Sequence, residues 1–199
     1  MMDNTYSKLI TSGIKLFGDY GFDAVSVRDI VADSEVNISA VSYHFGGKHE
    51  LYQAVVNHLA SEVKTRLSEF NTTEFAQMSL QDMEQRLTNI IAEFQEMFLS
   101  RNGISRLNIF TREISSPDKN NTHQYFVMMI DSVHDFFKNV LHTYYTRRNE
   151  DTEKIEFVIS LLITTLKNNT LKKSEPLCAK YYQPDMLERL TQLVLYGKL

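Results

Sequence analysis

Apolar residues recur at intervals of three and four positions along most of this chain, and this periodicity limits its fold more than any other feature. In one stretch the four-residue spacing is strict, and it aligns Leu51, Val55, Leu59, Val63 and Leu67 on one face of a helix. The 199 residues include only seven glycines and three prolines, too few for an all-β protein that turns roughly every ten residues. We therefore expect an all-α protein.

Local signals mark the ends of the expected helices. Gly21 follows the last turn of the first helix, as a C-terminal glycine does. Ser26 and Asp29 form a capping-box pattern at the start of the second helix, and Asn37 is a strong N-cap for the third. The expected helices cover about residues 5–20, 26–33, 37–45, 48–70, 83–98, 103–115, 126–144, 155–166 and 187–194.

The second and third helices are short, and a turn at residues 34–37 joins them into a helix-turn-helix. If Val36, Val41 and Phe45 pack inward, four side chains of the third helix point outward: Ile38, Ser39, Ser42 and Tyr43. Exposed apolar residues are common on surfaces, but this set also suits a recognition helix. There, hydroxyl groups donate to phosphate and Ile38 contacts a thymine methyl in the major groove.

The charge of the chain requires any phosphate-binding surface to be local. The formal net charge is -4, and residues 1–50 hold four basic and seven acidic residues, a net charge of 4 − 7 = −3. A diffuse basic surface is therefore excluded. Lys48 at the start of the long fourth helix and Ser26 at the start of the second supply local donors where helix termini already favour an anion.

Other functional classes have little support in the sequence. The segment Gly46–Lys48 matches neither a P-loop nor a dinucleotide-binding turn, and no two histidines have a helical metal-ligand spacing. Asp131 and His134 are closest to a ligand pair, and we interpret them as solvated or lining a pocket edge. We expect no metal, no cofactor and no enzyme activity, since no catalytic Ser, His and Asp set is recognisable.

The only cysteine, Cys178, excludes an internal disulfide and is expected to be a packing residue in a reducing compartment. The N-terminus lacks the basic and apolar regions of a signal peptide, and no segment approaches the roughly 18 apolar residues of a membrane span. The sequence therefore predicts a cytoplasmic protein without a membrane partner.

Residues 5–56 closely resemble the N-terminal domain of the TetR family of bacterial transcriptional repressors, with the signatures "LF…GF…SVRDI" and "YHFGGK..L" in order and at the family's spacing. The resemblance implies DNA contacts from Ser26, Arg28, Ser39, Ser42, Tyr43, His44 and Lys48, beside the base contact inferred for Ile38. Two positions depart from the family pattern. Val25 replaces a usual threonine, and Glu35 replaces a usual glycine in the turn, where a side chain costs about 1 kcal/mol of strain.

The segment "VNISAVSYHFGGKHELY", which contains the recognition helix, and the later segment "LNIFTREISSPD" together resemble the CecR-type branch of the family. This resemblance implies a helix-turn-helix domain over residues 1–46 and a helical effector-binding and dimerisation domain over residues 47–199. Its last two long helices would form the interface of a homodimer, and we expect Leu162 to lie there.

An apolar or aromatic effector is expected to bind among helices of the second domain. Its predicted contacts are Phe94, Phe98, Phe110, Arg112, Phe126 and Met129, although each apolar one would equally suit a plain core. Arg112 would orient the polar group of the effector, because a charge on an otherwise apolar helix needs a partner.

We therefore expect a homodimeric repressor that a small molecule releases from a palindromic operator. Two alternatives stay open at this point. The chain could be an activator or a constitutive DNA-binding protein without an effector, or a helical ligand-binding protein or enzyme with a vestigial helix-turn-helix.

Overall fold

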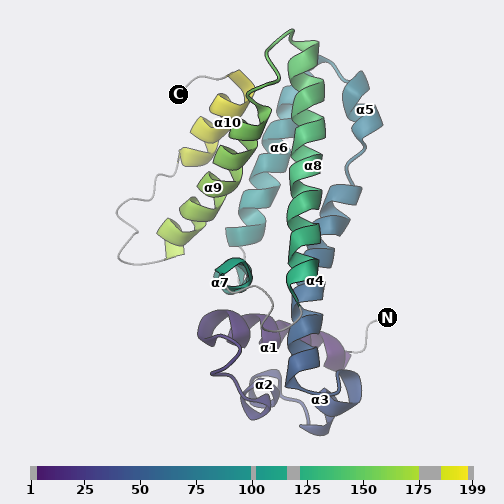
Figure 1. Ribbon diagram of the computed structural model, residues 1–199, viewed down its shortest axis with the longest axis vertical. Coiled ribbons are helices and arrows are strands. Elements are labelled where there is room, and N and C mark those ends of the chain that lie inside the picture. Colours follow the sequence, from purple (N-terminus) through teal and green to yellow (C-terminus); the bar gives the residue numbers. More distant parts are fainter. Residues whose placement is uncertain (1–3, 100–101, 116–121, 175–184, 197–199) are drawn as a thin grey trace. The chain divides into compact units, whose positions relative to one another are not determined.

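The computed structural model describes residues 4–99, 102–115, 122–174 and 185–196, and these contain ten helices and no strand (Figure 1). The predicted all-α fold is confirmed. The helices are α1 (Asn4–Tyr20), α2 (Val27–Ser34), α3 (Ser39–His44), α4 (Lys48–Ser68), α5 (Thr72–Gln77), α6 (Leu80–Leu99), α7 (Gly103–Ser115), α8 (His123–Arg147), α9 (Ile155–Ser174) and α10 (Met186–Tyr196). Of the predicted features, Cys178 lies outside the described residues.

The short helix α5 was not expected from the apolar periodicity. Asn71 is its N-cap, and the side chain of Asn71 accepts a hydrogen bond of 3.0 Å from the backbone N–H of Glu74. An N-cap residue three positions before a glutamate is the signal that would have predicted this helix. None of the helices in the described ranges has the length and hydrophobicity that crossing a membrane requires.

The chain forms two compact units, and the boundaries between them fall within α4 and α8. Unit 1 comprises residues 1–65 and 102–131, and unit 2 comprises residues 66–101 and 132–199. These units are clusters of contacts within the chain. The functional division expected at residue 46 therefore stays a prediction.

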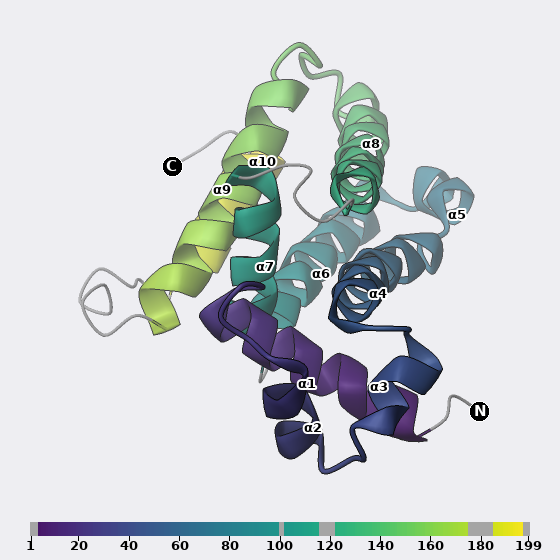
Figure 2. The ribbon, with the colours of Figure 1, turned by 60° about the horizontal axis from the view of Figure 1, so that its bottom comes forward.

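In unit 1, the helices α2 and α3 both pack against α1 (Figure 2). The shared core contains Leu9, Phe17, Ile30, Val41 and Leu51, each at most 1% exposed. Burial of an aliphatic or aromatic side chain of this size stabilises a fold by about 1.5–3 kcal/mol. Burial of these side chains therefore holds α1, α2 and α3 in one arrangement.

Helix α7 also packs against α1, and Gly18 permits their close approach. A Cβ atom at Gly18 would lie only 2.3 Å from the carbonyl oxygen of Ser105 in α7. The Ser105 hydroxyl donates a 2.7 Å hydrogen bond to Asp19 at the same crossing. Any larger residue at position 18 would force the two helices apart.

The ends of the first two helices follow the predicted local signals. Gly21 has φ of 85°, and its N–H donates to the carbonyl of Phe17 at 2.9 Å. Ser26 and Asp29 form the predicted capping box at the start of α2. Glu35 ends α2 in the left-handed conformation, with φ of 54°, so the glutamate occupies a backbone position that favours glycine.

Unit 2 has its own apolar core, to which α6, α8, α9 and α10 contribute. Glu84 ties three of these helices together, because its carboxylate accepts hydrogen bonds from Tyr144 at 2.9 Å, Tyr196 at 2.6 Å and Arg148 at 2.9 Å. Burial acts to raise the pKa of Glu84, but these hydrogen bonds outweigh it and hold that pKa below its ordinary value.

The prediction that Leu162 lies at a dimer interface is wrong. Leu162 is 0% exposed within the single chain and belongs to the core of unit 2. The face of α9 that contains Leu162 packs against α6 and α10. On the side of α9 away from this core, 70% of Phe157 is exposed, and Ile163 on its flank is 39% exposed. Periodicity identified the apolar stripe that contains Leu162, but it did not show whether that stripe faces the core or a second protomer.

Candidate nucleic-acid interface

The turn between α2 and α3 is held by short-range hydrogen bonds. The N–H of Val36 donates to the carbonyl of Val31 at 3.2 Å, which ends α2. The side chain of Asn37 then accepts from the Ser39 N–H at 3.0 Å and from the Ser39 hydroxyl at 2.9 Å. The N-cap of α3 is Ile38, without a side-chain cap hydrogen bond, so the prediction that Asn37 is the N-cap is one residue early, although its side chain binds the first helical residue, Ser39.

Helix α3 exposes the side chains that were predicted to point outward. Val41 is 1% exposed and anchors the helix in the core of unit 1, whereas Tyr43 is 85% exposed and Ile38 is 52% exposed. Ser39 and Ser42 are exposed too. We name these four exposed residues the reading face of α3. It carries three hydroxyl groups and one branched aliphatic side chain, the group types that contact phosphates and thymine methyls.

Lys48 directly follows the two glycines that end the α3 segment, at the first position of α4. Its ammonium nitrogen lies 4.3 Å from the centroid of the Phe22 ring, within cation–π range. Phe22 in turn packs edge-on against Tyr52 of α4, with ring centroids 5.1 Å apart. The lysine is half-buried, and the aromatic ring holds its charge near the start of α4.

Ser26 and Arg28 are exposed at the start of α2. The Ser26 hydroxyl donates a 2.6 Å hydrogen bond to the Asp29 carboxylate, and the Ser26 N–H donates another of 2.8 Å. These bonds hold the pKa of Asp29 below its ordinary value. The Ser26 hydroxyl could therefore donate to a phosphate only if its hydrogen bond to the Asp29 carboxylate were broken.

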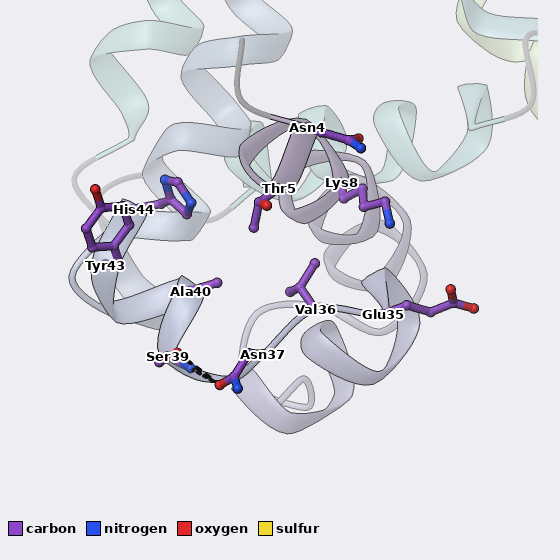
Figure 3. A pocket seen from close by; sticks show the side chains of 10 residues that line it. All are labelled: Asn4, Thr5, Lys8, Glu35, Val36, Asn37, Ser39, Ala40, Tyr43 and His44. Carbon is purple, nitrogen blue, oxygen red and sulfur yellow. Dashed lines mark hydrogen bonds between the residues drawn. The ribbon is translucent and has the colours of Figure 1, made fainter.

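The first turn of α1 lies beside α3, and aromatic contacts join the two. The ring of Tyr6 stacks on that of Phe45 with centroids 4.9 Å apart, and it meets the half-buried His44 edge-on at 6.3 Å. A hollow of about 550 Å³ opens next to this contact. In Figure 3, residues of α1 and α3 form two of its sides, and the turn that contains Glu35 and Asn37 forms another.

The residues predicted to bind an effector fall in both units. Phe110 and Phe126 belong to unit 1, where their rings lie 5.6 Å apart, and Met129 is half-buried in the same unit. Phe94 belongs to unit 2 and packs against Phe137 at 5.3 Å. Phe98 is part of α6, and its side chain lies outside the described residues.

Arg112, the remaining predicted effector contact, binds backbone groups of α1. Its Nη1 donates to the carbonyl of Phe17 at 2.6 Å and to that of Gly18 at 2.7 Å. These carbonyls lie in the last turn of α1, where a cation is favourable, and that of Phe17 also accepts the hydrogen bond from the Gly21 N–H. Arg112 therefore fastens α7 to the end of α1.

The neighbouring Glu113 is 5% exposed and accepts two hydrogen bonds. The Tyr52 hydroxyl of α4 donates to it at 2.6 Å, and the Thr122 hydroxyl before α8 donates at 2.6 Å. Burial, and then the bond to Glu113, raise the pKa of Tyr52 above its ordinary value, so that this tyrosine stays a donor. Sequence reasoning noted the charged pair on an apolar helix but missed these partners.

The second helix of this helix-turn-helix is exposed and bears hydroxyl groups, and a lysine begins the helix that follows it. These features define the class of helix-turn-helix DNA-binding proteins. Residues 9–55 match the model of the tetR family of bacterial regulatory proteins. The helix-turn-helix segment of this chain, residues 9–55, is therefore a TetR-family segment. This is a family of transcriptional regulators and not of enzymes.

Two curated relatives match parts of the chain. The probable HTH-type transcriptional regulator YttP of Bacillus subtilis is 33% identical over 91 residues, which cover 46% of this chain and 42% of YttP. The dual regulator CecR of Shigella flexneri is 40% identical over 53 residues, 27% of this chain and 23% of CecR. The matches thus span less than half of either relative, and assignment to the CecR-type branch stays a prediction.

A solved structure has the same fold over nearly the whole chain. The transcriptional regulator FadR of Bacillus subtilis, determined in complex with stearoyl-CoA, superposes with a TM-score of 0.66. The alignment covers 98% of this chain and 100% of FadR, at 12% sequence identity. At this identity the likeness establishes the fold alone.

Proposed function

We propose that the protein is a cytoplasmic, homodimeric transcription factor that binds a palindromic DNA operator. The reading face of α3 carries this proposal, because it presents an exposed tyrosine and isoleucine without an apolar surface to cover them. Lys48 adds a positive charge at the start of the next helix. These side chains are suited to contact base edges in a major groove and the phosphates beside it. An exposed tyrosine and isoleucine gain little from contact with solvent alone.

Each residue of the interface has a separate part in the proposed complex. Ile38 contacts a thymine methyl and reads sequence, whereas Tyr43, Ser39 and Ser42 donate to phosphates or base edges. Lys48 neutralises one phosphate, and its contact with the Phe22 ring limits the side-chain freedom lost on binding. His44, Arg28 and Ser26 complete the predicted contacts from the same helix-turn-helix.

This proposal is tested by DNA-binding titrations of Lys48→Ala and Ile38→Ala over a range of salt concentrations. Lys48→Ala is expected to weaken binding to specific and to random DNA by the same factor. It should also flatten the slope of log K against log salt concentration by about 0.9 for each protomer. Ile38→Ala is expected to lose roughly 1 kcal/mol of discrimination at one base position. Affinity selection from random duplexes followed by sequencing measures this loss.

Lys64→Ala is the matched control, because Lys64 is exposed on the same helix, farther from α3 in sequence. It should leave both the slope and the preferred sequence unchanged. Equal salt slopes for Lys48→Ala and the wild type would show that Lys48 does not contact a phosphate. Identical selected sequences for Ile38→Ala and the wild type would remove the base-reading role of Ile38.

We further propose that the protein is a repressor and that an amphipathic small molecule releases it from DNA. FadR, which shares the fold, was determined with stearoyl-CoA, a long apolar chain with a polar end. Phe110 and Phe126 are buried against each other in unit 1, and they would give a matching apolar site to a ligand that opens this contact. Arg112 bonds the last turn of α1, so that a ligand that displaces α7 would strain the helix-turn-helix.

A titration of the protein–DNA complex with stearoyl-CoA tests the proposed release. The wild type is expected to leave DNA, and Phe110→Leu to shift the half-release concentration several-fold while its affinity for DNA stays unchanged. Free coenzyme A, which lacks the apolar chain, is the control ligand. DNA binding that no long-chain ligand reduces would favour the alternatives, an activator or a constitutive DNA-binding protein.

The homodimer is proposed to form through the side of α9 that lies away from the core of unit 2, where 70% of Phe157 is exposed. Helix α10 packs beside α9 in unit 2 (Figure 1). A twofold interface uses each exposed residue twice, which doubles the contribution of a side chain such as Phe157. Two protomers would then present two reading faces to the two halves of a palindrome.

A further inference from the structure

We propose that the hollow between α1 and α3 is a second DNA-backbone site, with Lys8 as its charged residue. This inference rests on the proposed DNA-binding function, and it adds α1 to an interface that was assigned to the helix-turn-helix and the start of α4. In Figure 3, Asn4, Thr5 and Lys8 of α1 lie along one side of the hollow, and Ser39 and Tyr43 of α3 lie along another.

The groups around the hollow are those that bind phosphate. Lys8 contributes an ammonium group, Thr5, Ser39 and Tyr43 contribute hydroxyls, and Asn4 contributes an amide. Side chains of these types, with backbone N–H groups, make most protein contacts to the phosphates and sugars of DNA. The hollow of about 550 Å³ has room for a stretch of sugar-phosphate backbone rather than for a single ion.

Lys8 differs from the other lysine of α1, because it has no acidic partner in the part of the chain that the structure describes. Lys15 forms an ion pair with Asp33, and this contact raises the pKa of Lys15 above its ordinary value. Lys8 is exposed, and no carboxylate among the described residues lies within salt-bridge distance of it. Its charge is therefore available to a phosphate without breaking an existing bond.

The position of Lys8 relative to the reading face is fixed before any DNA arrives. Tyr6 lies two residues before Lys8, and its ring is stacked on Phe45 and set edge-on against His44. These contacts fasten the first turn of α1 to the end of α3. Because Tyr43 borders both the hollow and the reading face, a duplex whose groove receives α3 brings a strand across the hollow.

Among the described residues that line this hollow, Glu35 has the one carboxylate. Its negative charge opposes a phosphate bound by Lys8, so the two residues should have opposite effects on DNA affinity. Replacing Glu35 with glutamine removes the charge and keeps a long side chain at the left-handed backbone position. The variant therefore changes the electrostatics of the hollow without relieving the backbone strain.

The test compares Lys8→Gln, Glu35→Gln and Lys64→Gln in DNA-binding titrations at several salt concentrations, with circular dichroism to verify folding. Lys8→Gln is expected to weaken specific and random duplexes by a similar factor of about 3–10, and to flatten the salt slope by about 0.9 for each protomer. Glu35→Gln should strengthen binding to both duplexes. Lys64→Gln, an exposed change elsewhere in unit 1, should have neither effect.

The Lys8→Gln and Lys48→Ala effects should add in the double variant, because the two lysines contact different phosphates. If Lys8→Gln matches Lys64→Gln in affinity and slope while the wild type binds DNA, the inference about the hollow is wrong and the proposed function stands. If the folded wild type binds no duplex at low salt, the proposed function fails and the inference fails with it.

Discussion

The Phe157→Glu variant is expected to sediment as a monomer at concentrations where the wild type is a dimer. Phe157 is 70% exposed on the single chain, so its replacement leaves the core of unit 2 intact. In a twofold interface the substitution would bring in two carboxylates without partners, and an unpaired buried charge costs several kcal/mol. Analytical ultracentrifugation measures the mass, and the loss of the dimer should also weaken binding to a palindrome.

Leu162→Glu is the comparison that separates interface from core. Leu162 is 0% exposed, so this variant should unfold unit 2, with a loss of helical circular dichroism that Phe157→Glu does not show. If Phe157→Glu is folded and still sediments as a dimer, the dimer interface does not lie on this face of α9.

The Glu113→Ala variant is expected to lower the free energy of unfolding by about 3 kcal/mol. Glu113 accepts hydrogen bonds from Tyr52 and Thr122, and each buried donor left without an acceptor costs about 1–3 kcal/mol. Because α7 and α4 lose this connection beside Arg112, DNA affinity should fall as well. Urea unfolding followed by circular dichroism measures the change in stability.

A double-mutant cycle with Tyr52→Phe shows whether the hydrogen bond is the cause. The phenylalanine removes the donor that Glu113→Ala leaves unsatisfied, so the double variant should lose less stability than the sum of the single variants. Strict additivity of the two losses would mean that the Tyr52–Glu113 bond contributes nothing measurable, and that Glu113 acts through packing alone.

The local features of this protein could be predicted because short-range interactions determine them. A capping box at Ser26, a glycine after α1 and an Asn37 side chain that binds the first residue of α3 each involve atoms within four residues of one another. The outward direction of Tyr43 and Ile38 follows from the inward direction of Val41 on the same helix. The interface assigned to α3 and Lys48 therefore rests on information carried by the sequence.

The partners of charged groups could not be predicted in the same way. Arg112 meets carbonyls 94 and 95 residues away in sequence, and Glu113 meets a tyrosine 61 residues away. The sequence indicated only that this charged pair needed partners. Whether those partners were a ligand, solvent or another helix depended on how α7 packs against α1.

By itself, the sequence determined which segments are helical, with the exception of α5, where most of them begin and end, and which side of α3 faces outward. All of these follow from periodicity and capping over a few residues. The tertiary structure decided that the apolar stripe of α9 that contains Leu162 enters the core of unit 2 and not a dimer interface, because that stripe packs against α6 and α10. It also set Lys8 beside the recognition helix, because the stacking of Tyr6 on Phe45 joins residues that are distant along the chain.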